Sequence, residues 1–155
     1  ARIAAHPDRI GGILGELSVT APPAGITQHI DKINRLFASD TYEEILAALE
    51  ADGGEWAMKE LAALHSKSPQ TCKVALRQLK EGGEMHDFAA QMTQEYAIGS
   101  RVVQMHDFLE GVRALIVDKD HSPKWDPAKP EAVTEDWIDA IFAPLPDDEK
   151  WTPLT

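Results

Sequence analysis

The sequence predicts an all-α protein: a helical bundle of about six helices with an extended Pro-rich tail. Apolar residues recur at helical spacing between residues 26 and 117, and no stretch alternates apolar and polar residues over the length of a strand. Short Gly or Pro breaks separate the periodic segments. These patterns predict a linker or lead-in over 1–25, a helical domain over 26–117, and an extended tail over 118–155 with one short helix.

The first elements follow from local punctuation. Residues 1–25 contain several glycines and prolines and few periodic apolar positions, which favours a linker. From Ile26 the apolar period becomes helical. Thr41 and Glu44 have the spacing of a capping box, so a second helix is expected to begin there and to end at the glycine pair 53–54.

The middle helices have similar start and stop signals. One is expected over about 55–65, from its apolar spacing. The next should begin with Ser68 as the N-cap and Pro69 at the first helical position. It is expected to end at the glycine pair 82–83, and a longer helix should follow over about 85–104.

The last helices precede and interrupt the tail. Asp107 and Glu110 repeat the capping spacing, so a helix is expected to begin at Asp107. Repeated prolines after Asp118 predict mostly extended chain. Thr134 is expected to cap one short helix that runs through Phe142.

Composition argues against several partners. The 155-residue chain has a net charge of −11, which disfavours nucleic acid and anionic membranes as partners. Its apolar runs are far shorter than the roughly 20 residues of a membrane span. The lone cysteine, Cys72, can form no internal disulfide, suits a reducing compartment, and is expected to lie on the apolar side of a helix. The opening at Ala1 suggests a processed or truncated chain.

The sequence contains no motif for catalysis, metal binding or a cofactor. The six histidines show no metal-ligand spacing such as HExxH. A nucleophile-elbow motif, a phosphate-binding loop and a dinucleotide fingerprint are also missing. We therefore expect no catalytic residue, no metal ligand and no cofactor on this chain.

One charge pattern differs from this background. Lys73, Arg77 and Lys80 are spaced i, i+4, i+7 and share a helix face, within a stretch (67–80) that contains no Asp or Glu. Such a stripe suits a phosphate-bearing ligand. A solvated face whose long side chains cover the core is the alternative, and the residues alone favour it.

Several segments resemble a known family. They are HIDKINRLF (29–37), TYEEILAALEADG (41–53), SPQTCKVALRQLKEG (68–82), HDFLEGVRALIVDKDHSPKW (106–125) and VTEDWI (133–138). In this order they resemble the C-terminal part of 3-hydroxyisobutyryl-CoA hydrolases, which belong to the crotonase (enoyl-CoA hydratase/isomerase) superfamily. The run DKD at 118–120 with SPKW at 122–125 is particular to the hydrolase branch.

The resemblance implies that this chain is not catalytic alone. In that family the oxyanion-hole amides and catalytic carboxylates lie in an N-terminal β/α core, from which residues 1–25 would lead in. The C-terminal helices pack on that core and wall off the acyl-CoA pocket. Leu115 and Lys119 match positions near the CoA moiety, although relatives often have an aromatic at the position of Leu115. The stripe of Lys73, Arg77 and Lys80 is then expected near the entrance to the CoA site.

The resemblance also implies the partners and location. The partners are an acyl-CoA substrate, which carries the only coenzyme, and the N-terminal crotonase core or other subunits. The location is the cytoplasm in a bacterium, or the mitochondrial matrix in a eukaryote.

Three interpretations of function remain open. The first is the C-terminal helical part of a 3-hydroxyisobutyryl-CoA hydrolase-like thioesterase of valine catabolism. The second is the same part of an enoyl-CoA hydratase/isomerase family enzyme with another reaction, because a fold does not fix a reaction. The third is a stand-alone helical interaction module.

Overall fold

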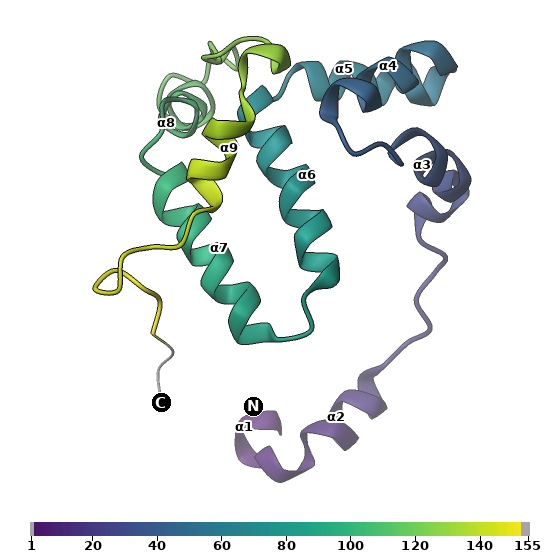
Figure 1. The fold of residues 1–155 in the computed structure, drawn as a ribbon. Helices are drawn as coiled ribbons and strands as arrows, with labels where there is room; N and C mark the ends of the chain where they lie inside the picture. Colours follow the sequence, from purple (N-terminus) through teal and green to yellow (C-terminus); the bar gives the residue numbers. More distant parts are fainter. Residues whose placement is uncertain (1, 153–155) are drawn as a thin grey trace. The chain divides into compact units, whose positions relative to one another are not determined.

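The structure is a computed structural model that describes residues 2–152, and every regular element in this range is helical (Figure 1). The all-α class predicted from the sequence is therefore confirmed. The chain divides into two units between Asn34 and Arg35, and each is described by itself. None of the helices within 2–152 is long and apolar enough to cross a membrane.

The first unit contains short helices where the sequence predicted a linker. They are α1 (Arg2–Ala5), η1 (Pro7–Arg9), α2 (Ile10–Leu17), η2 (Gly25–His29) and the start of α3 (Ile30–Leu36). In α2, Ile10, Leu14 and Leu17 have helical spacing, which the glycines between them obscured. Glu16 forms ion pairs with Arg2 and Arg9 and so joins α2 to the turns before it. The prediction that residues 1–25 lead in from another domain is not tested by this structure and stays a prediction.

The second unit contains the remaining elements. They are α4 (Tyr42–Asp52), α5 (Glu55–His65), α6 (Pro69–Glu84), α7 (Phe88–Val102), α8 (His106–Val112), the π-helical turn η3 (Arg113–Val117), η4 (Pro130–Ala132) and α9 (Glu135–Phe142). Three hydroxyl caps confirm the predicted starts: Thr41, Ser68 and Thr134 accept hydrogen bonds from the backbone N–H groups three residues on. Gly53 ends α4 with φ +62°, a conformation that favours glycine.

Three predicted helix boundaries were wrong. Helix α6 continues through the glycine pair 82–83 to Glu84, and a Cβ on Gly82 would lie at an ordinary contact distance, 3.6 Å, from the Gln91 amide nitrogen of α7. Helix α7 begins at Phe88, because the Asp87 carboxylate caps the N–H of Ala89 at 3.0 Å. Helix α8 begins at His106, because the carboxylate of its second residue, the predicted cap, is buried against another element.

Two apolar clusters hold the second unit together. In the first, the end of α3 packs with α4 and α5 through Leu36, Ile45, Leu49, Ala57 and Leu61. In the second, α9 lies against both α6 and α7 (Figure 1) through Val74, Ile98, Val133, Ile138 and Ile141. Arg101 of α7 donates to the backbone oxygens of Ile141, Ala143 and Pro144. These carbonyls at the end of α9 have no partner within the helix, so Arg101 satisfies them.

We expect the Leu49→Ala substitution to lower the free energy of unfolding by about 2–5 kcal/mol, because it leaves a cavity at a fully buried position. The same substitution at Leu79, which is 77% exposed, should change it by less than about 0.5 kcal/mol. Urea denaturation followed by circular dichroism measures both. Equal losses at the two positions would contradict the packing of the first cluster.

Candidate functional site

A serine, an aspartate and a histidine meet between α6 and α8. The Ser68 hydroxyl donates to the Asp107 carboxylate at 2.5 Å, and His106 Nδ1 lies 3.0 Å from the same carboxylate. In a nucleophilic triad the histidine stands between the serine and the acid, because it takes the serine proton. Here the acid stands between the other two, so the set cannot activate Ser68. Within residues 2–152, no group of three or more His, Cys, Asp or Glu could hold a metal ion.

The Asp107 carboxylate instead anchors the loop that follows α8. Its side chain is 3% exposed, and it also accepts the backbone N–H of Asp126 at 2.9 Å. Beside it, Trp125 Nε1 donates to the backbone oxygen of Ser66 at 3.1 Å. The Trp125 ring packs beside Gly111 of α8, 3.5 Å from where a Cβ on that residue would stand. The charge of Asp107 raises the pKa of the exposed His106 imidazole through their hydrogen bond.

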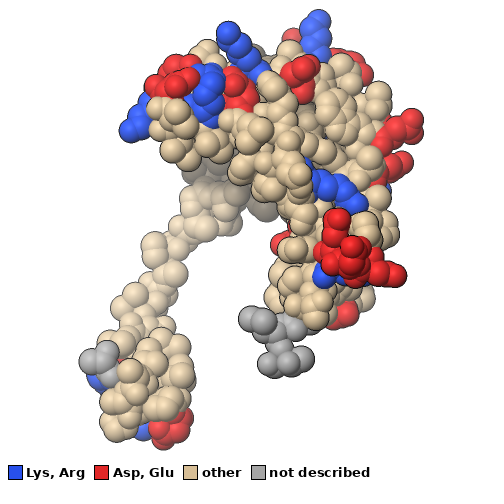
Figure 2. Space-filling view, turned by 90° about the vertical axis from the view of Figure 1, so that its left-hand side faces the viewer, with Lys and Arg blue, Asp and Glu red and all other residues tan. Residues whose placement is uncertain are grey.

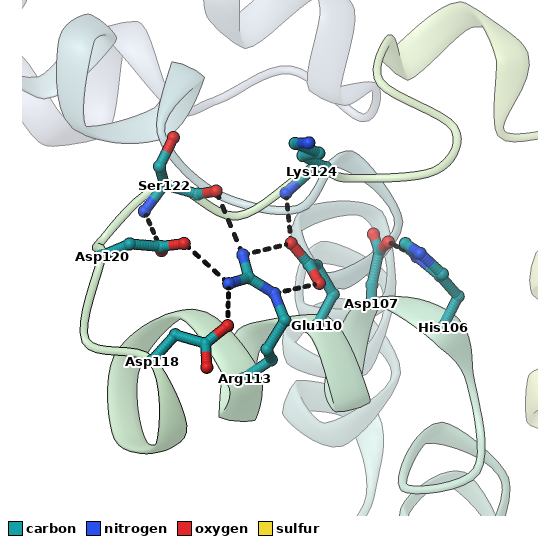
Figure 3. Close-up of polar contacts among 8 residues, drawn as sticks. All are labelled: His106, Asp107, Glu110, Arg113, Asp118, Asp120, Ser122 and Lys124. Carbon is teal, nitrogen blue, oxygen red and sulfur yellow. Dashed lines mark hydrogen bonds and ion pairs between the residues drawn. The ribbon is translucent and has the colours of Figure 1, made fainter.

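Arg113 connects the other end of this loop to α8 (Figure 3). Its Nε and Nη2 atoms bind the two oxygens of Glu110, each at 2.8 Å. Its Nη1 atom donates to the carboxylates of Asp118 and Asp120, each at 2.6 Å. Nη2 also lies 3.4 Å from the backbone oxygen of Ser122. The planar guanidinium carries enough donors in fixed directions to bind three carboxylates at once.

The same carboxylates also bind the loop backbone. Glu110 accepts the N–H of Lys124 at 2.8 Å, and Asp120 accepts the N–H of Ser122 at 2.9 Å. The hydrogen bonds from Arg113 and then Lys124 lower the pKa of Glu110 to about 2. Those from Arg113 and then Ser122 lower the pKa of Asp120. All of these bonds are charge-assisted, the stronger class of hydrogen bond, so residues 118–124 have a defined conformation.

This loop contains two residues with left-handed backbone. Lys119 has φ +57° and His121 has φ +54°, and both side chains are exposed. Such a conformation costs a non-glycine residue on the order of 1–2 kcal/mol. The Arg113 contacts and a bond from the His121 N–H to the Ala114 oxygen, at 3.1 Å, offset that cost. Among the described residues, the Lys119 ammonium has no hydrogen-bond or ion-pair partner.

Leu115, the second residue expected near CoA, lies in η3 and is 55% exposed. It belongs to a run of exposed apolar side chains on α8 and η3. This α8 patch consists of Phe108, Leu109, Leu115, Ile116 and Val117. The structure therefore places Leu115 in an apolar surface and Lys119 just beyond its end. Whether either residue contacts CoA stays a prediction.

The stripe of Lys73, Arg77 and Lys80 lies on one face of α6, as its spacing indicated. All three line a cavity of about 380 Å³ beside α4 and α9. Each pairs with carboxylates: Lys73 with Glu43 at 2.6 Å, Arg77 with Glu81 at 2.6 Å and Asp139 at 2.5 Å, and Lys80 with Asp40 at 2.7 Å. Arg77 also lies over the Phe142 ring, 4.4 Å from its centre.

These pairings give the cavity an acidic balance. Its lining contains the three cations of the stripe and six carboxylates, two of them from Glu84 and Glu135. On the face that Figure 2 draws, Lys and Arg likewise stand beside Asp and Glu rather than in an unbroken basic patch. A phosphate would have to compete with these carboxylates for the stripe. Its contact with CoA stays a prediction that this electrostatic setting does not favour.

Sequence reasoning missed the Arg113 network. Only the pair of Glu110 and Arg113 has helical spacing, and it can be found as an i, i+3 pair. Asp118 and Asp120 reach Arg113 because the chain turns back after η3, which no spacing rule predicts. The signal in the sequence was one arginine among three nearby acids.

We expect the Glu110 carboxyl to titrate near pH 2 in the folded protein and near 4.5 in the unfolded chain. Its contribution to stability is therefore complete above pH 4.5 and is lost as the pH falls toward 2. Carbon-13 NMR of the side chain measures the midpoint. The Arg113→Gln variant should raise it toward 4.5, whereas Lys129→Gln, an exposed control, should not. A midpoint near 4.5 in the parent protein would contradict the Arg113 network.

Comparison with known proteins places this geometry in a family. The family model described as enoyl-CoA hydratase/isomerase matches residues 3–142. The mitochondrial 3-hydroxyisobutyryl-CoA hydrolase of Xenopus laevis is 45% identical over 123 residues, which cover 79% of this chain and 32% of that protein. The human protein of the same name is 41% identical over 120 residues, covering 77% and 31%. The chain thus spans about a third of the length of these curated relatives.

Solved structures agree with the sequence matches. A carnitinyl-CoA dehydratase from Mycobacterium thermoresistibile superposes with a TM-score of 0.82 at 27% identity, covering 93% of this chain and 41% of that one. An enoyl-CoA hydratase from Rhodobacter sphaeroides 2.4.1 gives 0.80 at 36% identity, covering 96% and 45%. The resemblance found in the sequence is confirmed, and the chain belongs to the enoyl-CoA hydratase/isomerase family.

Proposed function

We propose that this chain is the C-terminal helical portion of a 3-hydroxyisobutyryl-CoA hydrolase-like thioesterase. The observation that carries the proposal is the match to such hydrolases at up to 45% identity over only about a third of their length. In this proposal the rest of the protein supplies the catalytic core, and the helices pack on it and close the CoA site. The substrate carries the coenzyme, and the helical portion needs no cofactor of its own.

The α8 patch supports packing on another part of the protein. Its five side chains are between 44% and 67% exposed, and they lie close together in the sequence, on α8 and η3. Contiguous exposed apolar surface is uncommon on a soluble monomer unless something covers it. In the proposed arrangement the catalytic core covers this patch and so fixes the loop that follows it relative to the substrate.

Lys119 and Leu115 are the residues of this chain that we place near CoA. Lys119 is an exposed cation without a partner among the described residues, and phosphate oxygens are strong acceptors for such a group. Leu115 offers an apolar contact one helical turn earlier. The stripe of Lys73, Arg77 and Lys80 instead joins α6 to α4, to α9 and to Asp40 just before α4 through its ion pairs.

The proposed reaction adds water to the thioester of 3-hydroxyisobutyryl-CoA and releases 3-hydroxyisobutyrate and CoA. Its developing oxyanion needs backbone N–H donors, and its water needs a carboxylate base. We assign both to the rest of the protein, because the Ser68–Asp107–His106 set lacks the order that a nucleophile requires. This chain contributes substrate binding and water exclusion.

A second candidate is the same portion of an enzyme that hydrates an enoyl-CoA. The Rhodobacter sphaeroides structure, which is called an enoyl-CoA hydratase, favours it at 36% identity and a TM-score of 0.80. The vertebrate relatives, which are called mitochondrial 3-hydroxyisobutyryl-CoA hydrolases, favour the hydrolase and a mitochondrial location. In a bacterium the corresponding location would be the cytoplasm. Product analysis with both thioesters separates the two reactions.

We expect the chain alone to release no CoA from 3-hydroxyisobutyryl-CoA above the rate without enzyme, whereas the complete protein should turn it over. A thiol-reactive dye that measures free CoA tests both samples. Turnover that copurifies with the chain alone would contradict the assignment of the catalytic groups to the rest of the protein. Hydration of crotonyl-CoA by the complete protein, without thioester hydrolysis, would favour the second candidate.

We expect Ile116→Asp to change the free energy of unfolding of the chain alone by less than about 0.5 kcal/mol, because Ile116 is 67% exposed. In the complete protein the same change should cost more than about 2 kcal/mol, because it buries a charge without a partner. Met58→Asp, at an exposed position of α5, is the matched control. Equal effects of Ile116→Asp in both samples would show that the patch stays uncovered.

A further inference from the structure

We propose that Arg113 is a positioning residue for CoA recognition, because it binds the two carboxylates that flank Lys119 and thereby leaves the Lys119 ammonium free for a phosphate. This inference rests on the proposed function, which places Lys119 near CoA. It assigns a role to Arg113 that neither the helical fold nor the thioester chemistry requires.

The residues on either side of Lys119 are acids that could pair with its ammonium. Asp118 precedes it and Asp120 follows it, so this flexible lysine has a carboxylate on either side of it in the sequence. A lysine paired with either carboxylate would offer a phosphate less charge. The structure shows a different pairing: the Oδ2 atom of each aspartate accepts a hydrogen bond from Arg113 Nη1 at 2.6 Å (Figure 3). Within residues 2–152, Lys119 has no such contact.

The backbone supports the same separation. Asp120 Oδ1 accepts the N–H of Ser122 at 2.9 Å, so this carboxylate is bound on both sides. The left-handed conformation of Lys119, with φ +57°, lies between the two aspartates that turn back toward Arg113. Glu110, held by two bonds of 2.8 Å, fixes the guanidinium plane and leaves Nη1 for the two aspartates.

Arginine is the residue type that this arrangement needs. A lysine at position 113 would keep the charge but would lose the planar fork that reaches three carboxylates at once. At least one of Asp118 and Asp120 would then be released beside Lys119. Arg113→Lys therefore tests the pairing of the aspartates rather than the net charge of the loop.

The experiment uses the complete protein, with CoA itself as the binding probe and two substrates. Calorimetry gives the dissociation constant for CoA, and kinetics give KM for 3-hydroxyisobutyryl-CoA and for the pantetheine thioester, which lacks the nucleotide phosphates. The single variants are Lys119→Gln, Arg113→Lys and, as the control, Lys129→Gln, which removes an exposed charge outside the loop. Thermal unfolding checks that each variant folds.

We expect Lys119→Gln and Arg113→Lys each to weaken CoA binding and raise KM for the CoA ester by about two- to fivefold, the range for one exposed charge pair. KM for the pantetheine thioester should not change in either variant. The double variant should be no worse than the single ones, because both act through the same ammonium. Lys129→Gln should behave as the parent protein.

A rescue distinguishes this role from a purely structural one. Adding Asp118→Asn and Asp120→Asn to Arg113→Lys removes the carboxylates that would capture Lys119. Affinity for CoA should then return toward the parent value. If Arg113→Lys had instead disrupted only the loop structure, removing two more hydrogen-bonding carboxylates would weaken CoA binding further.

The outcomes separate this inference from the proposed function. Additive losses in the double variant, equal losses with both thioesters, or no rescue would overturn the role of Arg113. Unchanged CoA binding in Lys119→Gln would overturn both that role and the placement of Lys119. If the protein binds CoA with the expected pattern but hydrolyses no thioester, the inference stands and the hydrolase assignment fails.

Discussion

The buried carboxylate of Asp107 connects three parts of the chain that are distant in sequence. It accepts the hydroxyl of Ser68, which also caps α6, and it accepts the backbone N–H of Asp126 beyond the loop. The Asp107 side chain is only 3% exposed, so these hydrogen bonds must replace the water molecules that would otherwise solvate its carboxylate. The start of α6, the start of α8 and the far end of the loop therefore hold one another in place, and the Arg113 network binds the part of the loop between them.

Pairing of scarce cations with abundant carboxylates recurs throughout the second unit. The chain has 15 Lys and Arg against 26 Asp and Glu, and several of these cations form ion pairs. Arg113 binds three carboxylates and Arg77 binds two, so the charges of both arginines are already engaged in contacts within the chain. An exposed pair contributes little, whereas a guanidinium shared among several carboxylates fixes their geometry. The cations of the stripe are therefore engaged by carboxylates, whereas the Lys119 ammonium has no such partner among the described residues.

Local signals predicted the helices well, and tertiary contacts account for what they missed. The caps at Thr41, Ser68 and Thr134 depend on residues three positions away, so the sequence shows them directly. The glycine pair 82–83 resembled a helix end, but α6 continues through it to Glu84. The charges of α6 could be placed on one face from their spacing, but most of their acidic partners lie outside α6: Glu43 on α4, Asp139 on α9 and Asp40 just before α4. The spacing of residues along one helix cannot predict which side chains of other elements they will contact.

The same reasoning applies to the candidate site. Leu115 and Lys119 came from resemblance to a family and not from any pattern in the residues, and the structure adds the reason why Lys119 is distinctive. Two aspartates beside a lysine would ordinarily suggest a neutralised, solvated turn. Arg113 reverses that expectation by binding both aspartates, and Glu110 fixes the guanidinium that does so. A helix end whose acids pair with one arginine leaves the Lys119 ammonium without a carboxylate partner among the described residues, beside an apolar patch, which suits a ligand that joins a phosphate to an apolar chain.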